Sequence, residues 1–167
     1  MKKVLVIGSP GSGKSTFARK LQDITGLPLV YLDRLQWNAD RTVVDRSVFL
    51  ARLEEALQMD AWIIDGNYAC TLEMRLQVCD TVFFLDFPVD LCLKGIEERR
   101  GTVRPDMPWV EEEEDPAFTE FVRRFPVETR PVILDLLERY DHKEIHTFTS
   151  RQEADQYIQR LYYENSR

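Results

Sequence analysis

Nine residues near the N-terminus constrain this chain more than any other segment. They read Gly-Ser-Pro-Gly-Ser-Gly-Lys-Ser-Thr and directly follow the apolar run Val4–Ile7. A glycine-rich turn between a strand and a helix presents backbone N–H groups and the positive end of the helix dipole to an anion. Lys14 is then placed to reach the β and γ phosphates of a ligand, and the Ser15 hydroxyl to ligate Mg²⁺. The sequence therefore predicts a phosphate loop made of Gly8, Ser9, Pro10, Gly11, Ser12, Gly13, Lys14, Ser15 and Thr16.

Short apolar runs alternate with amphipathic helical patterns along the rest of the chain. We expect strands at 3–7, 29–32, 62–64, 81–85 and 144–148. We expect helices at 14–25, 45–59, 71–78 and 88–100, one from 127 or 131 to 140, and a C-terminal one that starts at the capping box Ser150-Arg-Gln-Glu153. In the helix at 45–59 the predicted buried face is Val48, Leu50, Leu53, Ala56 and Leu57. The alternation predicts an α/β fold with a mainly parallel sheet, and 167 residues suit a single domain.

The segment from Gly101 to Pro126 differs in character from its surroundings. It contains four prolines and the acidic run 111–115, and six of the 16 arginines of the chain lie between positions 99 and 130. A segment of this length cannot build its own core, so we interpret it as an excursion from the main domain. Guanidinium groups make bidentate contacts to phosphate, which makes this the second region where chemistry is expected. The acidic run itself is interpreted as a solvated face.

Composition excludes several classes of function. The net charge is −7, and outside the acidic run the chain is nearly neutral, so non-specific binding to a nucleic-acid backbone is not favoured. No apolar run approaches the roughly 18 residues of a membrane span, and we expect a cytoplasmic protein. Cys70, Cys79 and Cys92 are expected to be buried reduced thiols, and two histidines do not make a zinc site.

Several further motifs carry a family resemblance. They are Tyr31-Leu-Asp-Arg-Leu-Gln-Trp37, Trp62-Ile-Ile-Asp-Gly-Asn-Tyr68, Phe84-Leu-Asp-Phe-Pro88, Arg104-Pro-Asp-Met and the later pair Phe125-Pro and Arg130-Pro131. With the phosphate loop, they make the chain resemble the topology modulation proteins, an adenylate-kinase-like group of P-loop proteins. The resemblance implies a P-loop NTPase fold with a five-stranded parallel sheet in order 2-3-1-4-5, and a small mobile lid at about 101–130. It also implies ATP with Mg²⁺ as the phosphoryl donor, and the name of the group suggests a link to DNA supercoiling.

The chain departs from the adenylate kinase pattern on the acceptor side. Ala69 stands where that family has the arginine that grips the nucleoside monophosphate, and Gln36 stands where it has an arginine after the second strand. Gly95 matches the arginine that stacks on adenine. These differences argue against AMP as the acceptor.

Two aspartates follow predicted strands. Asp65 ends a buried strand where a P-loop enzyme needs a carboxylate for Mg²⁺ or its water, although a plain Asp-Gly turn also explains it. Asp33 ends the strand at 29–32, at the sheet edge where α/β folds bind ligands. It either accepts a substrate hydroxyl or orients Mg²⁺, or else caps a turn. The neighbouring Trp37 is either a platform for the acceptor or a packing residue.

Three arginines are candidates for stabilising transferred charge. Arg99 matches the phosphate-gripping arginine of adenylate kinases, while its place at a helix end also suits a cation. Arg124 and Arg130 would close over the γ-phosphate as the lid shuts, or alternatively pair with the acidic run 111–115.

These observations predict an ATP-dependent, Mg²⁺-assisted phosphotransferase that acts on a small-molecule or nucleotide acceptor. The expected catalytic residues are Lys14, Asp33, Arg99, Arg124 and Arg130, and the expected metal ligands are Ser15 and Asp65. One alternative is a nucleotide-binding NTPase or regulator linked to DNA topology. The predicted partners are ATP and an unidentified acceptor, and the protein is expected to be a monomer or dimer.

Overall fold

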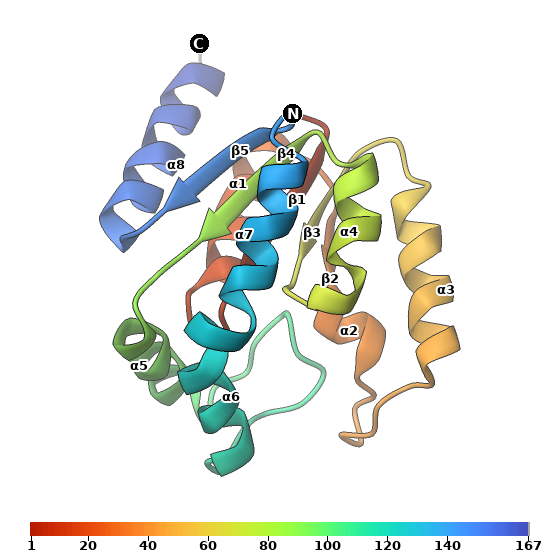
Figure 1. The fold of residues 1–167 in the computed structure, drawn as a ribbon, viewed down its shortest axis with the longest axis vertical. Coiled ribbons are helices and arrows are strands. Elements are labelled where there is room, and N and C mark those ends of the chain that lie inside the picture. The colour runs from red at the N-terminus through yellow and green to blue at the C-terminus, as the bar shows by residue number, and fades with distance from the viewer. Residues whose placement is uncertain (167) are drawn as a thin grey trace.

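Five parallel strands form one sheet in the order β2-β3-β1-β4-β5 in the computed structural model, which describes residues 1–166. The strands are β1 (Lys3–Gly8), β2 (Leu29–Tyr31), β3 (Trp62–Asp65), β4 (Thr81–Leu85) and β5 (Glu144–Phe148). Parallel neighbours require crossover connections, and a helix lies between each successive pair of strands (Figure 1). This confirms the predicted α/β fold and strand order.

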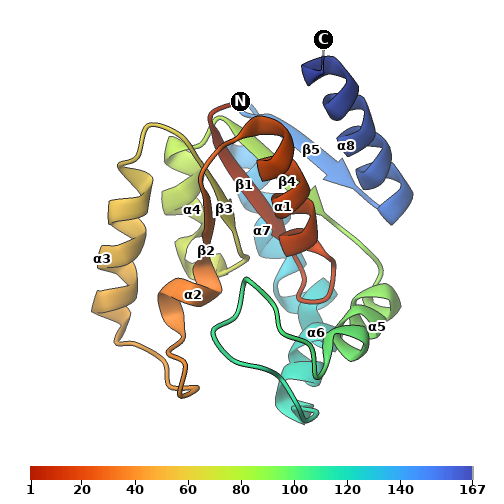
Figure 2. The ribbon, with the colours of Figure 1, turned by 180° about the vertical axis from the view of Figure 1, so that it is seen from behind.

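Helices cover both faces of the sheet (Figures 1 and 2). One face carries α3 (Arg46–Leu57), α4 (Ala69–Val78) and α7 (Arg130–Arg139), and the other carries α1 (Lys14–Thr25) and α8 (Arg151–Asn165). The short α2 (Leu32–Gln36), α5 (Val89–Arg99) and α6 (Pro116–Glu128) lie with the 101–115 segment beyond the carboxyl ends of the strands. The edge of the sheet where α/β folds bind ligands is therefore enclosed by these elements.

Alternate residues of the central strands build the two halves of the core. Leu5 and Ile7 pack with the α3, α4 and α7 side, whereas Val4 and Val6 pack with the α1 and α8 side. All four are fully buried. Burial on both faces explains why these strands read as continuous apolar runs in the sequence.

The end of α1 and the start of α8 lie where capping residues in the sequence predict them. Gly26 ends α1 in the left-handed conformation, and its N–H donates to the Gln22 carbonyl at 2.8 Å. At the start of α8 the Ser150 hydroxyl accepts from the Glu153 N–H, and the Glu153 carboxylate accepts from the Thr149 N–H at 2.7 Å. The predicted capping of this helix is confirmed.

Two expectations about burial are wrong. The buried face of α3 consists of Phe49, Leu53, Ala56 and Leu57, and Val48 is exposed while Leu50 is half-buried. Phe49 faces the core in place of Val48, and its ring packs on the ring of Tyr68 with ring centres 5.3 Å apart. Cys70 is exposed because it lies in the first turn of α4 on the side away from the core, whereas Cys79 and Cys92 are buried as predicted.

The excursion after Gly101 contains a helix that the proline pattern concealed. Asp115 caps α6 by accepting the N–H groups of Ala117 and Phe118 at 3.0 and 3.2 Å. Pro116 occupies the first turn, where a missing N–H costs nothing, and Pro126 lies in the last turns of the helix. Within residues 1–166, no helix combines the length and apolar character needed to cross a membrane.

Candidate active site

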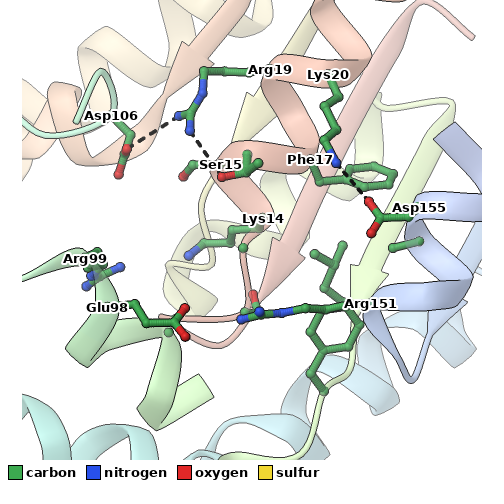
Figure 3. A pocket seen from close by; sticks show the side chains of 18 of the residues that line it. Lys14, Ser15, Phe17, Arg19, Lys20, Glu98, Arg99, Asp106, Arg151 and Asp155 are labelled. Carbon is green, nitrogen blue, oxygen red and sulfur yellow. Dashed lines mark hydrogen bonds and ion pairs between the residues drawn. The ribbon is translucent and has the colours of Figure 1, made fainter. Parts of the chain in front are cut away.

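The phosphate loop connects β1 to α1 and lines a cavity of about 410 Å³, which we call the loop cavity. Gly11 and Gly13 have φ angles of 80° and 88°, which only glycine adopts without strain. Figure 3 shows Lys14 projecting into this cavity, with Arg19 and Asp106 on one side and Glu98 and Arg151 on the opposite side. The Ser12 hydroxyl is buried and has no hydrogen-bond partner among the described residues. The loop thus combines a cation, helix N–H groups and an unsatisfied hydroxyl, as a bound phosphate requires.

Ser15 and Asp65 form the most direct contact between the loop and its neighbouring strand. The Ser15 hydroxyl donates to Asp65 Oδ2, and Asp65 Oδ1 is buried without a partner among residues 1–166. Burial raises the pKa of Asp65 to about 6, against the opposing field of Lys14. A hydroxyl and a carboxylate with an unsatisfied oxygen are ligands that Mg²⁺ accepts, so these residues fit that ion.

The described residues hold no group of three or more histidine, cysteine, aspartate or glutamate side chains arranged to bind a metal. Mg²⁺ commonly takes one or two protein ligands and completes its shell with water and substrate phosphates. Two protein ligands at Ser15 and Asp65 are therefore consistent with a magnesium ion that arrives with a nucleotide.

A second cavity of about 700 Å³, which we call the Asp33 cavity, adjoins the loop cavity. Both are lined by Lys14, Ser15, Arg99, Arg104 and Asp106, so the two cavities are adjacent, and we call them together the cleft. The Asp33 cavity is also lined by Trp37 and Tyr68, and by Gln36 and Ala69 at the two positions where the adenylate kinase pattern has arginines. The structure thus brings four of the predicted catalytic and metal-binding residues, Lys14, Ser15, Asp33 and Arg99, to the wall of the Asp33 cavity, and their roles stay predictions.

Asp33 lies on α2 and not at the end of a strand, because β2 stops at Tyr31. The Tyr68 hydroxyl donates to Asp33 Oδ1 at 2.6 Å. Burial and the nearby Asp33 charge raise the pKa of Tyr68, so the phenol stays protonated and remains a donor. One carboxylate oxygen of Asp33 is thereby fixed in orientation.

Arg75 is a residue that the sequence analysis missed. Its side chain is fully buried on α4, and it donates to the carbonyls of Gly66, Asn67 and Tyr68 at 2.9, 2.5 and 3.1 Å. Burial lowers its pKa to about 10. Arg75 therefore fixes the loop that carries Tyr68, a residue held at a φ of 28°. The available signal was a lone arginine on the apolar face that Leu72 and Leu76 define.

The 101–115 segment is held over the cleft by ion pairs. Arg99 pairs with Glu111 at 3.1 Å, and Arg104 pairs with both Asp106 at 3.3 Å and Glu111 at 3.6 Å. Arg19 of α1 reaches Asp106 at 3.7 Å. The interpretation of 111–115 as only a solvated face is therefore wrong at its two ends, because Glu111 binds two arginines and Asp115 caps α6.

Arg124 and Arg130 lie away from the cleft in this structure. Arg124 is exposed and pairs with Glu128 on its own helix at 2.6 Å. Arg130 makes a bidentate ion pair with Asp86, in which its Nε donates to Oδ1 at 2.8 Å and its Nη2 donates to Oδ2 at 2.9 Å. Neither arginine lines the loop cavity or the Asp33 cavity, and both described pairs differ from the expected pairing with 111–115. Their approach to phosphate on lid closure stays a prediction.

Two solved structures are similar to this chain in fold. Shikimate kinase from Acinetobacter baumannii, solved in complex with shikimate, matches with a TM-score of 0.62 and 17% identity, over 98% of this chain and 94% of that chain. Shikimate kinase from Bacteroides thetaiotaomicron matches with a TM-score of 0.59 and 17% identity, over 98% of each chain. This chain has the nucleoside-monophosphate-kinase-like P-loop fold. No protein-family model and no curated protein sequence matches it.

Proposed function

We propose that this protein is an ATP-dependent kinase that phosphorylates a hydroxyl group of a small molecule. The supporting observation is the Asp33 cavity, which Lys14 and Ser15 of the phosphate loop line together with Asp33, itself held by Tyr68. The fold that the chain shares with shikimate kinases agrees with this proposal. Such an arrangement brings a donor phosphate and an acceptor hydroxyl together without a covalent enzyme intermediate.

Each residue of the cleft has a role in this proposal. The loop N–H groups and Lys14 hold the β and γ phosphates, while Ser15 and Asp65 hold Mg²⁺, which neutralises phosphate charge when it is bound. Asp33 accepts the proton of the acceptor hydroxyl while the hydroxyl oxygen of the acceptor bonds to the γ-phosphorus. The bond from that phosphorus to the bridging oxygen breaks and leaves ADP. Arg99 and Arg104 line both cavities and stabilise the charge that is transferred between them.

Two variants separate nucleotide binding from phosphoryl transfer. Lys14→Ala is expected to weaken binding of ATP with Mg²⁺ at least tenfold, since a charge-assisted contact contributes about 1.5–3 kcal/mol. Asp33→Asn is expected to bind ATP normally and to lose roughly 10²-fold or more in acceptor phosphorylation, because the base is removed. Lys94→Ala, which removes an exposed lysine of α5, is the matched control.

Titration calorimetry and an ADP-release assay provide the two readouts. Unchanged ATP affinity in a folded Lys14→Ala variant would contradict the role of the loop. ATP hydrolysis that no acceptor stimulates, and that Asp33→Asn leaves unchanged, would instead favour a nucleotide-dependent regulator.

A further inference from the structure

The Asp33 cavity carries an excess of acidic side chains. Its basic residues are Lys14, Arg41, Arg99, Arg100 and Arg104, and its acidic residues are Asp33, Asp106 and all five of the run 111–115. Lys14 extends from the phosphate loop and is directed to the donor phosphates in the proposed function. The acidic residues at 112–115 are exposed, so salt screens their repulsion of an anion. The excess of carboxylates therefore opposes the entry of an anionic acceptor most strongly at low ionic strength.

Most of the cations in this cavity already have partners. Arg99 and Arg104 pair with Glu111, and Arg104 also pairs with Asp106. The Arg41 guanidinium lies 5.1 Å from the ring centre of Trp109 and donates to the Val110 carbonyl at 3.2 Å. Gln36 and Ala69 contribute no charge to the wall. Among the described residues Arg100 has no side-chain partner, so besides Lys14 it is the cation of the wall that an acceptor phosphate or carboxylate would bind without breaking an existing contact. Any further cation contact would require an existing one to break.

Aromatic rings supply the other notable surface of the cavity. Trp37 and Trp109 meet edge to face with ring centres 5.7 Å apart, and a β-bridge to Val43 fixes the backbone of Trp37. Two buried polar atoms of lining residues, Asn67 Oδ1 and Trp109 Nε1, have no partner among the described residues. Flat rings with a few convergent polar groups are typical of sites for small cyclic molecules.

On the basis of the proposed kinase function, we propose that the acceptor is an uncharged, ring-bearing alcohol of the nucleoside or sugar type. Its ring lies against Trp37 and Trp109, and one hydroxyl meets Asp33. That hydroxyl oxygen bonds to the γ-phosphorus, ADP departs with the electrons of the broken P–O bond, and the hydroxyl proton passes to Asp33. The product is a phosphate monoester, whose added negative charge favours release from the acidic cavity.

Matched pairs of compounds test the charge requirement directly. Nucleotide-free protein is titrated by calorimetry with adenosine and AMP, guanosine and GMP, and thymidine and TMP. Glucose with glucose 6-phosphate tests the sugar arm, and methyl shikimate with shikimate tests a carboxylate. We expect an uncharged member of one arm to bind at least tenfold more tightly than its charged partner. Among the nucleoside and glucose arms, the arm in which this occurs identifies the nucleoside or the sugar class, and the shikimate arm tests only the effect of a carboxylate.

Variants test the two surfaces separately. Trp37→Ala is expected to weaken acceptor binding at least tenfold and to leave ATP affinity unchanged, whereas Trp37→Phe keeps a flat ring and retains most of the affinity. Combined Glu112→Gln, Glu113→Gln and Glu114→Gln changes are expected to reduce the discrimination against the charged partner several-fold. The matched control combines Glu54→Gln with Glu55→Gln on the exposed side of α3, and it should leave the discrimination against the charged partner unchanged.

The outcomes separate this inference from the proposed function. Tighter binding of monophosphates or of shikimate than of their uncharged partners would overturn the acceptor class while the kinase function stood. Failure of every uncharged compound to bind would also overturn it. Absence of ATP binding by the wild-type protein would contradict the kinase function itself.

Discussion

The backbones of Gly11 and Gly95 lie in direct contact, so that the phosphate loop rests on α5. A Cβ added to Gly95 would lie 2.1 Å from the Gly11 carbonyl oxygen, and one added to Gly11 would lie 2.0 Å from the Cys92 carbonyl oxygen. Both obstacles are backbone atoms, which cannot rotate away as a side chain does. The contact gives a physical reason for Gly95 at a position where the adenylate kinase pattern has an arginine.

This contact predicts an unusual response to a helix substitution. Replacing a helical glycine by alanine normally stabilises a protein by about 1 kcal/mol. We expect Gly95→Ala to destabilise this protein by about 1–3 kcal/mol through overpacking, and to weaken ATP binding at least tenfold by displacing the loop. Urea unfolding and calorimetry measure the two effects.

Gly101→Ala is the control for this prediction. Its added Cβ meets nothing within 4 Å, although its φ of 74° carries some strain. We expect it to leave ATP affinity unchanged. A Gly95→Ala variant that is stabilised and binds ATP normally would show that the loop and α5 adjust freely.

The buried Asp65 makes the stability of the metal-free protein depend on pH. Its pKa is about 6 in the folded chain and 3.8 in the reference state, so between these values the folded state holds more protons than the unfolded state. The free energy of unfolding is therefore expected to fall by on the order of 2–3 kcal/mol as the pH rises from about 4 to about 6.

Chemical denaturation across this pH range, in the presence of a chelator, measures the effect. Asp65→Asn removes the titration, so its unfolding free energy is expected to lack this decrease. An identical pH dependence in wild type and Asp65→Asn would assign the titration to other groups.

Local patterns predicted the sheet well, because burial on both faces leaves a clear apolar signal. The bounds of β4 at Thr81–Leu85 and of α1 at Lys14–Thr25 agree with the sequence prediction. In α1 the phosphate loop and Gly26 mark both ends. The start of α2 was less visible, because β2 has only three residues and Asp33 follows it within a helix.

The missing parts of the site depend on contacts between distant segments. Arg75 lies on a helix whose neighbouring positions are apolar, and its partners are backbone carbonyls, which leave no pattern of side chains in the sequence. The pair of Arg130 with Asp86 joins residues 44 positions apart. Such pairing cannot be derived from spacing or composition alone.

Arg75 is expected to be a positioning residue for Asp33. Arg75→Lys keeps the charge but cannot reach three carbonyls, so the loop that holds Tyr68 should loosen. We expect kcat to fall at least tenfold with little change in ATP affinity, together with a loss of stability of about 1–3 kcal/mol. Arg139→Lys, which alters an exposed arginine paired with Glu73, is the control.

Tyr68→Phe distinguishes positioning from a purely structural role. It removes the hydrogen bond to Asp33 while keeping the ring that packs on Phe49. We expect Tyr68→Phe and Arg75→Lys both to lower kcat with little change in the KM for ATP, because both leave Asp33 less constrained. A kcat that Arg75→Lys leaves unchanged while stability falls would indicate that Arg75 only stabilises the fold.

The pair of Asp86 and Arg130 makes the predicted lid testable. Arg130 is the first residue of α7 and directly follows the α6 segment, and its guanidinium is held by both oxygens of Asp86. For Arg130 to reach a transferred phosphate, this pair has to open as residues 101–130 close over the cleft. We expect ATP analogue and acceptor together to slow amide hydrogen exchange across 101–130, because ligand contacts add to the ion pairs that already hold this segment. Arg130→Ala should lower kcat at least tenfold while ATP affinity stays within about twofold, since its contact forms mainly in the transition state.

Arg123→Ala, which removes an exposed arginine paired with Glu120 on the same segment, is the control and should leave both kcat and ATP affinity unchanged. Equal exchange with and without ligands, combined with normal turnover in Arg130→Ala, would make the pair a static brace between β4 and α7.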